Sequence, residues 1–458
     1  MVWYNILRFE KSMLKRKIEA CLEAFAKSPG GHALLIDGAR QVGKTYIIEE
    51  CGKRLFDVVV KLDFVKSKQA RAIFRDAEDE QDVLTRLTAF AKHRLVPGRT
   101  LFFFDEIQKC PEAVTVLKYL VQDGRFHYIL SGSLLGVELK NIRSVPVGFL
   151  DEAKMFPLDF EEFLWANGEQ PELLEAARTA WVERRPLAKF YHDRLIRLFR
   201  LYLVTGGMPE AVQAYVDTKD IRKVIDVQRK ILANYRRDIS QYNEGEALKI
   251  RSVFDRIAPE LSDRNKRFFS ASVKPEGRFD RLEDAYLWLI ESGVAIPSYC
   301  VGEPKVPLLL SEKPRLFKLF MNDVGLLAAT YMNGIQLKIL NGETTMNFGA
   351  IFENVVAQEL TAHGFRPNYY NSEKHGEVDF ILENDGKVLP IEVKCGKHYE
   401  RHHALSYLLG EAAPYGIDEA IVFDSDSFKA KGNVIYMPIY MAMFLAKAEL
   451  PEKMIYEV

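Results

Sequence analysis

The sequence ALLIDGARQVGKTYII, residues 33–48, decides the fold of the first third of this chain. An apolar run leads into a loop that matches the pattern GxxxxGK[ST] in full, and a helical segment follows. Gly38 and Gly43 let the backbone curl, so that consecutive N–H groups point into one concave anion site at a helix N-terminus. An ordinary glycine turn before a helix is the alternative. The strand and the helix on either side favour a loop that binds the phosphates of a nucleotide.

The residues of this loop have distinct expected roles. Lys44 supplies a positive charge against the β- and γ-phosphates of ATP, and the Thr45 hydroxyl binds Mg²⁺. ATP and Mg²⁺ are therefore the expected cofactors. The nucleotide-binding residues that we predict in the loop are Gly38, Ala39, Arg40, Gln41, Val42, Gly43, Lys44 and Thr45.

Two further motifs follow at the ends of expected strands. The apolar run 100–106, TLFFFDE, ends in Asp105, which we expect to bind Mg²⁺, and Glu106, which we expect to activate the attacking water. A solvated strand end is the alternative, but a position about sixty residues after the phosphate loop favours a Walker B motif. The next strand, 126–130, leads to Ser133, which either senses the γ-phosphate and the water or simply starts a loop.

Length and composition limit the number of domains and the class of protein. A chain of 458 residues is long enough for about three domains, and its net charge of −1 argues against a globally basic nucleic-acid binder. The five cysteines form no C-x-x-C pair, which indicates reduced thiols in a cytosolic protein. Charges interleave with the first apolar residues, and the longest uncharged apolar run, 434–446, is too short to cross a bilayer. We therefore expect a cytoplasmic protein with no secretory signal and no membrane segment.

The order of the motifs resembles that of the prokaryotic AAA-type ATPases that carry a C-terminal restriction-endonuclease-like domain of unknown role. The motifs are GARQVGKT, FFFDEIQ, ILSGSLL, FPLDFEEFL (156–164) and GGMPEAV (206–212). The resemblance covers most of the chain and implies an α/β fold: a P-loop NTPase parallel sheet with a helical lid, a winged helix and a C-terminal restriction-endonuclease-like α/β domain. The expected boundaries are 1–165 for the ATPase core, 166–240 for the lid, 241–335 for the winged helix-turn-helix and 336–458 for the nuclease-like domain.

The resemblance also bears on the nucleotide site. Related signal-transduction ATPases touch the adenine with a Gly-x-Pro sequence in the lid, which Gly207-Met208-Pro209 resembles. Pro209 also suits the first position of a helix, which is the alternative. Rival candidates for an arginine finger are Arg40, Arg125 and Arg143, and a finger that acts in trans would require a homo-oligomer.

Residues 245–335 contain helical runs and then two short apolar runs, 295–300 and 315–320, which suggests a winged helix-turn-helix. Its expected second helix is acidic and apolar, with only Arg278 and Arg281 at its start. The module could therefore lock the ATPase domain or bind a protein, as well as bind DNA. The helix before it carries basic residues that either contact nucleic-acid phosphates or form a solvated face: Arg222, Lys223, Arg229, Lys230, Arg236 and Arg237.

A second group of candidate residues lies in an expected hairpin, with strands 377–382 and 388–394 joined by a tight turn. Because side chains alternate along a strand, Glu392 and Lys394 share one face, and antiparallel pairing brings Asp379 close to them. Asp379 and Glu392 are predicted to bind Mg²⁺ through hard carboxylate oxygens. Lys394 orients the attacking water or stabilises the charge that develops on phosphorus.

This D-x(n)-E-x-K arrangement is the signature of restriction-type nucleases. Glu353, on an amphipathic helix ahead of the hairpin, stands in the place of their helical glutamate. As a bare pattern, E-x-K also occurs on any exposed strand. The predicted catalytic residues of this region are Asp379, Glu392, Lys394 and Glu353. Three histidines are expected to face nucleic-acid phosphates, with zinc binding as the alternative: His398, His402 and His403.

Two functions are open at this point. In the first, ATP binding and hydrolysis, with Lys44, Glu106 and Ser133 as catalytic residues, control a Mg²⁺-dependent nuclease-like domain that acts on DNA. In the second, the chain is an ATPase switch whose nuclease-like domain binds nucleic acid or a partner protein without cutting it.

Overall fold

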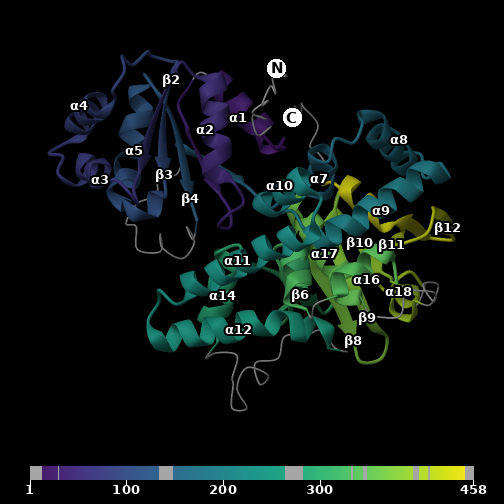
Figure 1. Cartoon of the computed structure of the whole chain (residues 1–458). Coiled ribbons are helices and arrows are strands. Elements are labelled where there is room, and N and C mark those ends of the chain that lie inside the picture. Colours follow the sequence, from purple (N-terminus) through teal and green to yellow (C-terminus); the bar gives the residue numbers. More distant parts are fainter. Residues whose placement is uncertain are drawn as a thin grey trace, which may run out of the picture.

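The computed structural model has an N-terminal α/β domain, purple to blue in Figure 1, beside a larger body coloured from teal to yellow. The residues that it describes are 13–28, 30–133, 148–263, 282–331, 334–343, 348–395, 402–410 and 413–448. No helix among them is both long enough and apolar enough to span a membrane.

The N-terminal domain alternates strands and helices along the chain. Its strands are β1 (Ala33–Asp37), β2 (Val58–Asp63), β3 (Thr100–Asp105), β4 (His127–Gly132) and β5 (Leu150–Lys154). Its helices are α1 (Ile18–Lys27), α2 (Lys44–Leu55), α3 (Lys68–Arg75), α4 (Glu80–Phe90), the 3₁₀ turn η1 (Ile107–Lys109) and α5 (Pro111–Asp123).

The five strands are parallel and lie in the order β2-β3-β4-β1-β5. Strand β3 shows why the inner strands are mainly apolar. Phe103 packs in a core with α1 and α2, whereas Phe102 and Phe104 pack in a second core with α3, α4 and α5, so both faces of the sheet are covered. The predicted α/β class with a parallel sheet is confirmed. Parallel strands end at one edge of the sheet, and this edge collects the candidate nucleotide residues.

A set of helices connects this domain to a second sheet. They are α7 (Phe160–Ala166), α8 (Pro171–Val182), α9 (Lys189–Thr205), α10 (Pro209–Thr218), α11 (Ile221–Ile239), α12 (Glu244–Ser262) and α14 (Glu283–Glu291). The strands of the second sheet are β6 (Ala295–Val301), β7 (Glu312–Met321), β8 (Asn368–Ser372), β9 (Gly376–Asn384), β10 (Lys387–Val393), β11 (Ala420–Asp424), β12 (Lys429–Lys431) and β13 (Val434–Pro438). Its other helices and 3₁₀ turns are η4 (Leu308–Ser311), α15 (Val324–Thr330), α16 (Ile335–Asn341), α17 (Gly349–Ala362), α18 (His403–Leu408) and η5 (Ile439–Phe444).

The second sheet has eight strands in the order β12-β13-β11-β10-β9-β8-β6-β7. The hairpin β6–β7, which we expected as the wing of a separate module, is part of this sheet, because β6 pairs in parallel with β8. The expected boundary near residue 335 therefore cuts a continuous sheet. The division of the chain into four domains stays a prediction, and Arg278 and Arg281 lie outside the described residues.

Candidate functional site

The phosphate loop follows β1 and ends where α2 begins, as its sequence predicts. Gly43 has a φ of +96° and is the N-cap of α2. A Cβ atom on Gly38 would lie 2.1 Å from the carbonyl oxygen of Met155, so that no larger residue fits there without a shift of the backbone. The two glycines thus set both the curl of the loop and its close approach to the chain after β5.

Lys44 lies within the curl of the loop. Its Nζ donates to the carbonyl oxygens of Gly38, at 2.6 Å, and Ala39, at 2.8 Å. Burial lowers the pKa of Lys44 to about 8, against the opposite effect of nearby carboxylates, chiefly that of Glu106. The charged ammonium is therefore held at a free-energy cost, which an anionic ligand would offset.

Asp105, at the end of β3, accepts three hydrogen bonds or ion pairs. Its Oδ1 accepts from the hydroxyls of Thr45, at 3.0 Å, and Ser131, at 2.6 Å. Lys61 Nζ lies 2.9 Å from its other oxygen and 2.6 Å from Glu49. The structure thus brings together the two residues that we predicted as Mg²⁺ ligands. It adds Ser131 and Lys61, which the motif did not indicate.

Glu106 and Ser133 are also brought together. Glu106 has a φ of +57°, and its Oε2 accepts from Gln108 Nε2 at 2.6 Å and from the Ser133 hydroxyl at 3.2 Å. Gln108 also donates to the Ser133 carbonyl oxygen at 2.8 Å. Gln108 holds both candidates in place, and sequence reasoning missed it although it lies only two residues beyond Glu106.

The candidate arginines differ in position. Arg40 Nε lies 3.4 Å from the Ser133 hydroxyl oxygen, and its guanidinium pairs with Asp238 of α11. Arg125 pairs with Asp123 and is half exposed. Arg143 lies outside the described residues. Of the two described candidates, Arg40 is the one whose contacts include a predicted site residue.

A cavity of about 420 Å³ lies beside the phosphate loop, where an adenine-contacting proline was expected. Pro209, the first residue of α10, lines it together with Gly43 and Tyr46. Arg16 lines it too, and this buried guanidinium donates to the carbonyl oxygens of Val42 (3.1 Å) and Phe156 (2.7 Å).

Arg16 was missed because nothing in the motifs points to it. Its Nε also lies 3.1 Å from Glu162 of the FPLDFEEFL segment. This segment therefore supports the phosphate loop through Arg16. The carboxylate of Asp159 in the same segment caps α7.

The second group of predicted residues lies at the hairpin β9–β10. Asp379 and Glu392 form the next opposed pair beyond Phe380 and Ile391, and each is 6% exposed. Asp379 Oδ2 accepts the backbone N–H of Val393 at 2.8 Å. We name this place, with the charged side chains around it, the acid pocket.

The remaining predicted residues of the acid pocket also converge. Lys394 pairs with Glu392, and the helical Glu353 of α17 is 2% exposed. Burial raises the pKa of Glu392 to about 8, and the charges of Asp379 and Glu353 add to this rise while Lys394 opposes it. The exposed strand that we kept as an alternative for E-x-K is therefore wrong.

The pocket contains a buried lysine that sequence reasoning missed. Lys318 of β7 is fully buried, with its Nζ 3.5 Å from Glu353 Oε2 and 2.6 Å from Glu377 Oε1. Among the described residues, no group of three or more His, Cys, Asp or Glu side chains is arranged to hold a metal ion. Any divalent ion would therefore rely on two carboxylates and water.

The predicted histidines do not form one surface. His402 is buried and its Nε2 lies 3.2 Å from the Tyr436 hydroxyl, so the phosphate-facing role that we predicted for it is wrong. His403 is exposed and bonds to the carbonyl oxygen of His375 through Nδ1 at 3.0 Å. His398 lies outside the described residues.

Comparison with known families bears on the first site. Residues 31–164 match the family described as AAA domain. The chain contains a P-loop ATPase domain of the AAA type. It is accordingly an ATP-binding and ATP-hydrolysing enzyme. Residues 196–337 and 348–441 match two domains of unknown function, DUF8612 and DUF4143. No curated protein matches the sequence.

Solved structures resemble the chain weakly. A Walker-type ATPase of Pyrococcus abyssi is 12% identical, with a TM-score of 0.43, over 70% of this chain and 97% of that one. The Orc1 protein of Aeropyrum pernix, in complex with DNA, is 12% identical (TM-score 0.32) over 71% and 94%. Cdc6p of Pyrobaculum aerophilum is 12% identical (TM-score 0.26) over 72% and 96%. At these values the likenesses carry no argument about function.

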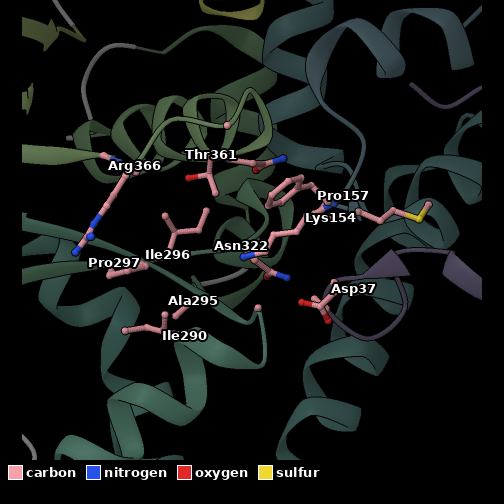
Figure 2. A pocket seen from close by; sticks show the side chains of 18 of the residues that line it. Asp37, Lys154, Pro157, Ile290, Ala295, Ile296, Pro297, Asn322, Thr361 and Arg366 are labelled. Carbon is pink, nitrogen blue, oxygen red and sulfur yellow. The ribbon is translucent and has the colours of Figure 1, made fainter. Parts of the chain in front are cut away.

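The ATPase domain meets the rest of the chain around a second cavity of about 500 Å³. Figure 2 shows Asp37 and Lys154 of the ATPase domain lining it together with Asn322 and Arg366 from the body that contains the second sheet. Close by, a Cβ atom on Gly293 would lie 3.1 Å from the backbone nitrogen of Ala39. The turn between α14 and β6 is therefore in direct contact with the phosphate loop.

Proposed function

We propose that the nucleotide state of the ATPase domain controls a Mg²⁺-dependent nuclease-like domain in the C-terminal part of the chain, and that this domain acts on DNA. The observation that carries the proposal is the convergence of Asp379, Glu392 and Lys394 with the helical Glu353. Ionisable groups are costly to bury, and clusters of buried carboxylates with perturbed pKa values occur preferentially at functional sites.

In the ATPase domain, Lys44 would bind the β- and γ-phosphates. Thr45 and Asp105, in contact with each other at 3.0 Å, would hold Mg²⁺ directly or through water. The contact between Pro209 and the cavity beside Gly43 supports a place for the adenine between the loop and α10.

Hydrolysis of ATP would use Glu106 as the general base. Gln108 and Ser133 hold its Oε2, so the carboxylate is oriented before the water arrives. Arg40 would stabilise the charge that develops on the γ-phosphate, since it contacts Ser133 within the same chain.

In the acid pocket, Asp379 and Glu392 would hold a divalent cation. Asp379 and Glu392 supply hard oxygen ligands, and the buried Glu392 Oε2 has no hydrogen-bond partner among the described residues. When bound, the ion would polarise a phosphodiester. Lys394 would orient the attacking water or stabilise the charge that develops on a phosphate oxygen.

Control of this pocket by ATP needs a physical connection, and Asp323 provides one. It follows β7, caps α15 by accepting the Leu326 N–H at 2.8 Å, and accepts the N–H of Gly207 at 2.5 Å. Gly207 lies two residues before Pro209, which lines the cavity beside Gly43. A movement of the lid at this cavity would therefore be felt at the end of β7.

Helix α17 makes a second connection. Asn354, beside Glu353, pairs with both backbone groups of Met321, at 2.8 and 3.0 Å. One turn further, Gln358 accepts the Val324 N–H and donates to the Tyr202 hydroxyl of α9, both at 2.8 Å. The helix that carries an acid-pocket residue is thus tied to the lid by buried hydrogen bonds.

The nuclease proposal is tested with the full chain on plasmid DNA and on labelled RNA, with Mg²⁺ or Mn²⁺ and with or without ATP. Asp379→Ala and Lys394→Ala should abolish cleavage while ATP hydrolysis continues. Lys387→Ala, a change of an exposed lysine on the same hairpin, is the matched control and should cut as the wild type does. Absence of cleavage of every substrate by the wild type would refute nuclease activity.

A second candidate function has its own support. Lys318 brings a positive charge into the acid pocket, so the pocket is partly neutralised by the protein itself. This favours a domain that binds nucleic acid or a partner protein without cutting. Gel-shift measurements with the same DNA and RNA, made beside the cleavage assay, distinguish the two functions.

A further inference from the structure

Lys318 reaches the acid pocket from outside the hairpin that supplies the predicted catalytic residues. It belongs to β7, which pairs with β6, and β6 pairs with β8. Its ammonium lies 5.0 Å from the centre of the Tyr369 ring of β8 and 2.6 Å from Glu377 of β9. Glu353 of α17 lies 3.5 Å away, so the side chain contacts three elements, and it is 0% exposed.

The charges around Lys318 explain why it can be buried. Glu353 comes from α17, Glu377 and Asp379 from β9, Glu392 from β10, and Lys394 directly follows β10. Burial alone would lower the pKa of Lys318, but Glu353, Glu377 and Asp379 together raise it above its usual value. Lys318 therefore carries a positive charge in this pocket, and its single ammonium partly compensates the carboxylates on its side.

This position bears on the number of metal ions that the pocket can hold. Where two divalent ions act on a phosphodiester, they lie about 3.5–4 Å apart and share a set of carboxylates. Here the Lys318 ammonium is 3.5 Å from Glu353, at the distance of an ion pair. A second divalent ion beside Glu353 would meet this buried positive charge at close range, where charges interact strongly.

We propose that Lys318 is a specificity-determining residue of the acid pocket, whose ammonium takes the place of a second divalent cation and restricts the pocket to one ion between Asp379 and Glu392. The inference rests on the proposed metal-binding function of the same pocket. In this arrangement Glu353 and Glu377 pair with Lys318, and Asp379 and Glu392 bind the metal ion.

The test measures Mn²⁺ binding to the full chain by electron paramagnetic resonance, in the absence of nucleotide so that the ATPase site contributes little. The wild type should bind one Mn²⁺ that Asp379→Ala abolishes. Lys318→Met should bind a second ion, or bind the first at least about tenfold more tightly, because a repelling charge is gone. Lys313→Met, on the exposed part of the same strand, should behave as the wild type does.

Lys318→Met leaves Glu353 and Glu377 buried without their cation, so its fold must be followed as well. Thermal melting with and without Mn²⁺ provides this second measurement. The variant should gain more stability from Mn²⁺ than the wild type gains, and a variant that unfolds without metal should refold when Mn²⁺ is added. Either result supports the proposal.

The proposal is overturned if Lys318→Met, folded or not, shows no gain in Mn²⁺ binding or in stabilisation by Mn²⁺ over the wild type. A wild type that binds one ion but cuts no substrate would refute the nuclease function and leave this inference standing. A wild type that binds two ions would overturn this inference and leave the nuclease function standing.

Discussion

ATP binding should take up protons from solution, because Lys44 is buried with a pKa of about 8. The ordinary value is 10.5, so the protein environment disfavours the charged ammonium by about 3 kcal/mol. Phosphate oxygens close to Lys44 would favour the ammonium again and raise its pKa. In every molecule whose Lys44 is neutral before ATP binds, Lys44 must then gain a proton.

The size of the uptake follows from the fraction of neutral lysine. At pH 8 about half of the molecules carry neutral Lys44, so binding should take up about 0.5 proton per ATP. The corresponding values are about 0.1 at pH 7 and about 0.9 at pH 9. By the same linkage, ATP affinity should fall as the pH rises above 8.

Isothermal titration calorimetry in two buffers with different ionisation enthalpies measures this number directly. Lys53→Met, a change of an exposed lysine on the same helix, should leave the uptake unchanged. Lys44→Met should lose most of the affinity. An uptake near zero at pH 8 that does not increase by pH 9 would refute the assignment of a destabilised Lys44 to the phosphate site.

Three further changes test other contacts. Gly38→Ala should weaken ATP binding at least about tenfold, since the new Cβ would lie 2.1 Å from the Met155 carbonyl oxygen; fluorescent nucleotide titration measures it. Asp323→Ala leaves the buried Gly207 N–H without its acceptor and should lower the free energy of unfolding by about 1–3 kcal/mol, measured in urea. Because the pKa of Glu392 is raised to about 8 in the folded protein, this residue stabilises the fold fully below about pH 4.5, and the stabilisation is lost by about pH 8. Glu392→Gln should therefore flatten the pH dependence of the melting temperature between these two pH values.

Each of these changes has a control and a contradicting result. Gly245→Ala places a methyl group in open space, and equal ATP affinities of the two alanine variants would contradict the close approach in the phosphate loop. Asp385→Ala changes an acid in the hairpin turn and should cost less than Asp323→Ala. A melting curve that keeps its full pH dependence in Glu392→Gln would show that another group titrates in this range.

The residues that sequence alone could predict are those whose geometry is local. The phosphate loop needs only eight consecutive residues between a strand and a helix, and Asp105 follows from a buried strand that ends in acids. Asp379 and Glu392 are thirteen positions apart but are joined by one tight turn, so strand alternation is enough to pair them.

The residues that were missed depend on contacts between distant parts of the chain. Arg16 reaches Val42 and Glu162 from the segment just before α1, which no motif marks. Lys318 enters the acid pocket only because β6 pairs with β8, and no turn or spacing in the sequence specifies that pairing. A hairpin that follows helices is typical of a winged helix, but here the hairpin β6–β7 forms part of the larger sheet.

Strand β7 links the lid to the acid pocket, which bears on the proposed control by ATP. One end of the strand leads to Asp323, which holds the Gly207 N–H of the lid, and Lys318 lies five residues earlier in the acid pocket. Strand β7 pairs with β6 at residues 312–313 and 317–321, and the turn before β6 touches the phosphate loop at Ala39. A shift of the lid would therefore reach Lys318 through β7 and Glu353 through α17, because both elements are hydrogen-bonded at Met321. Under the proposed function, the strand that would respond to the lid is therefore the strand that carries Lys318.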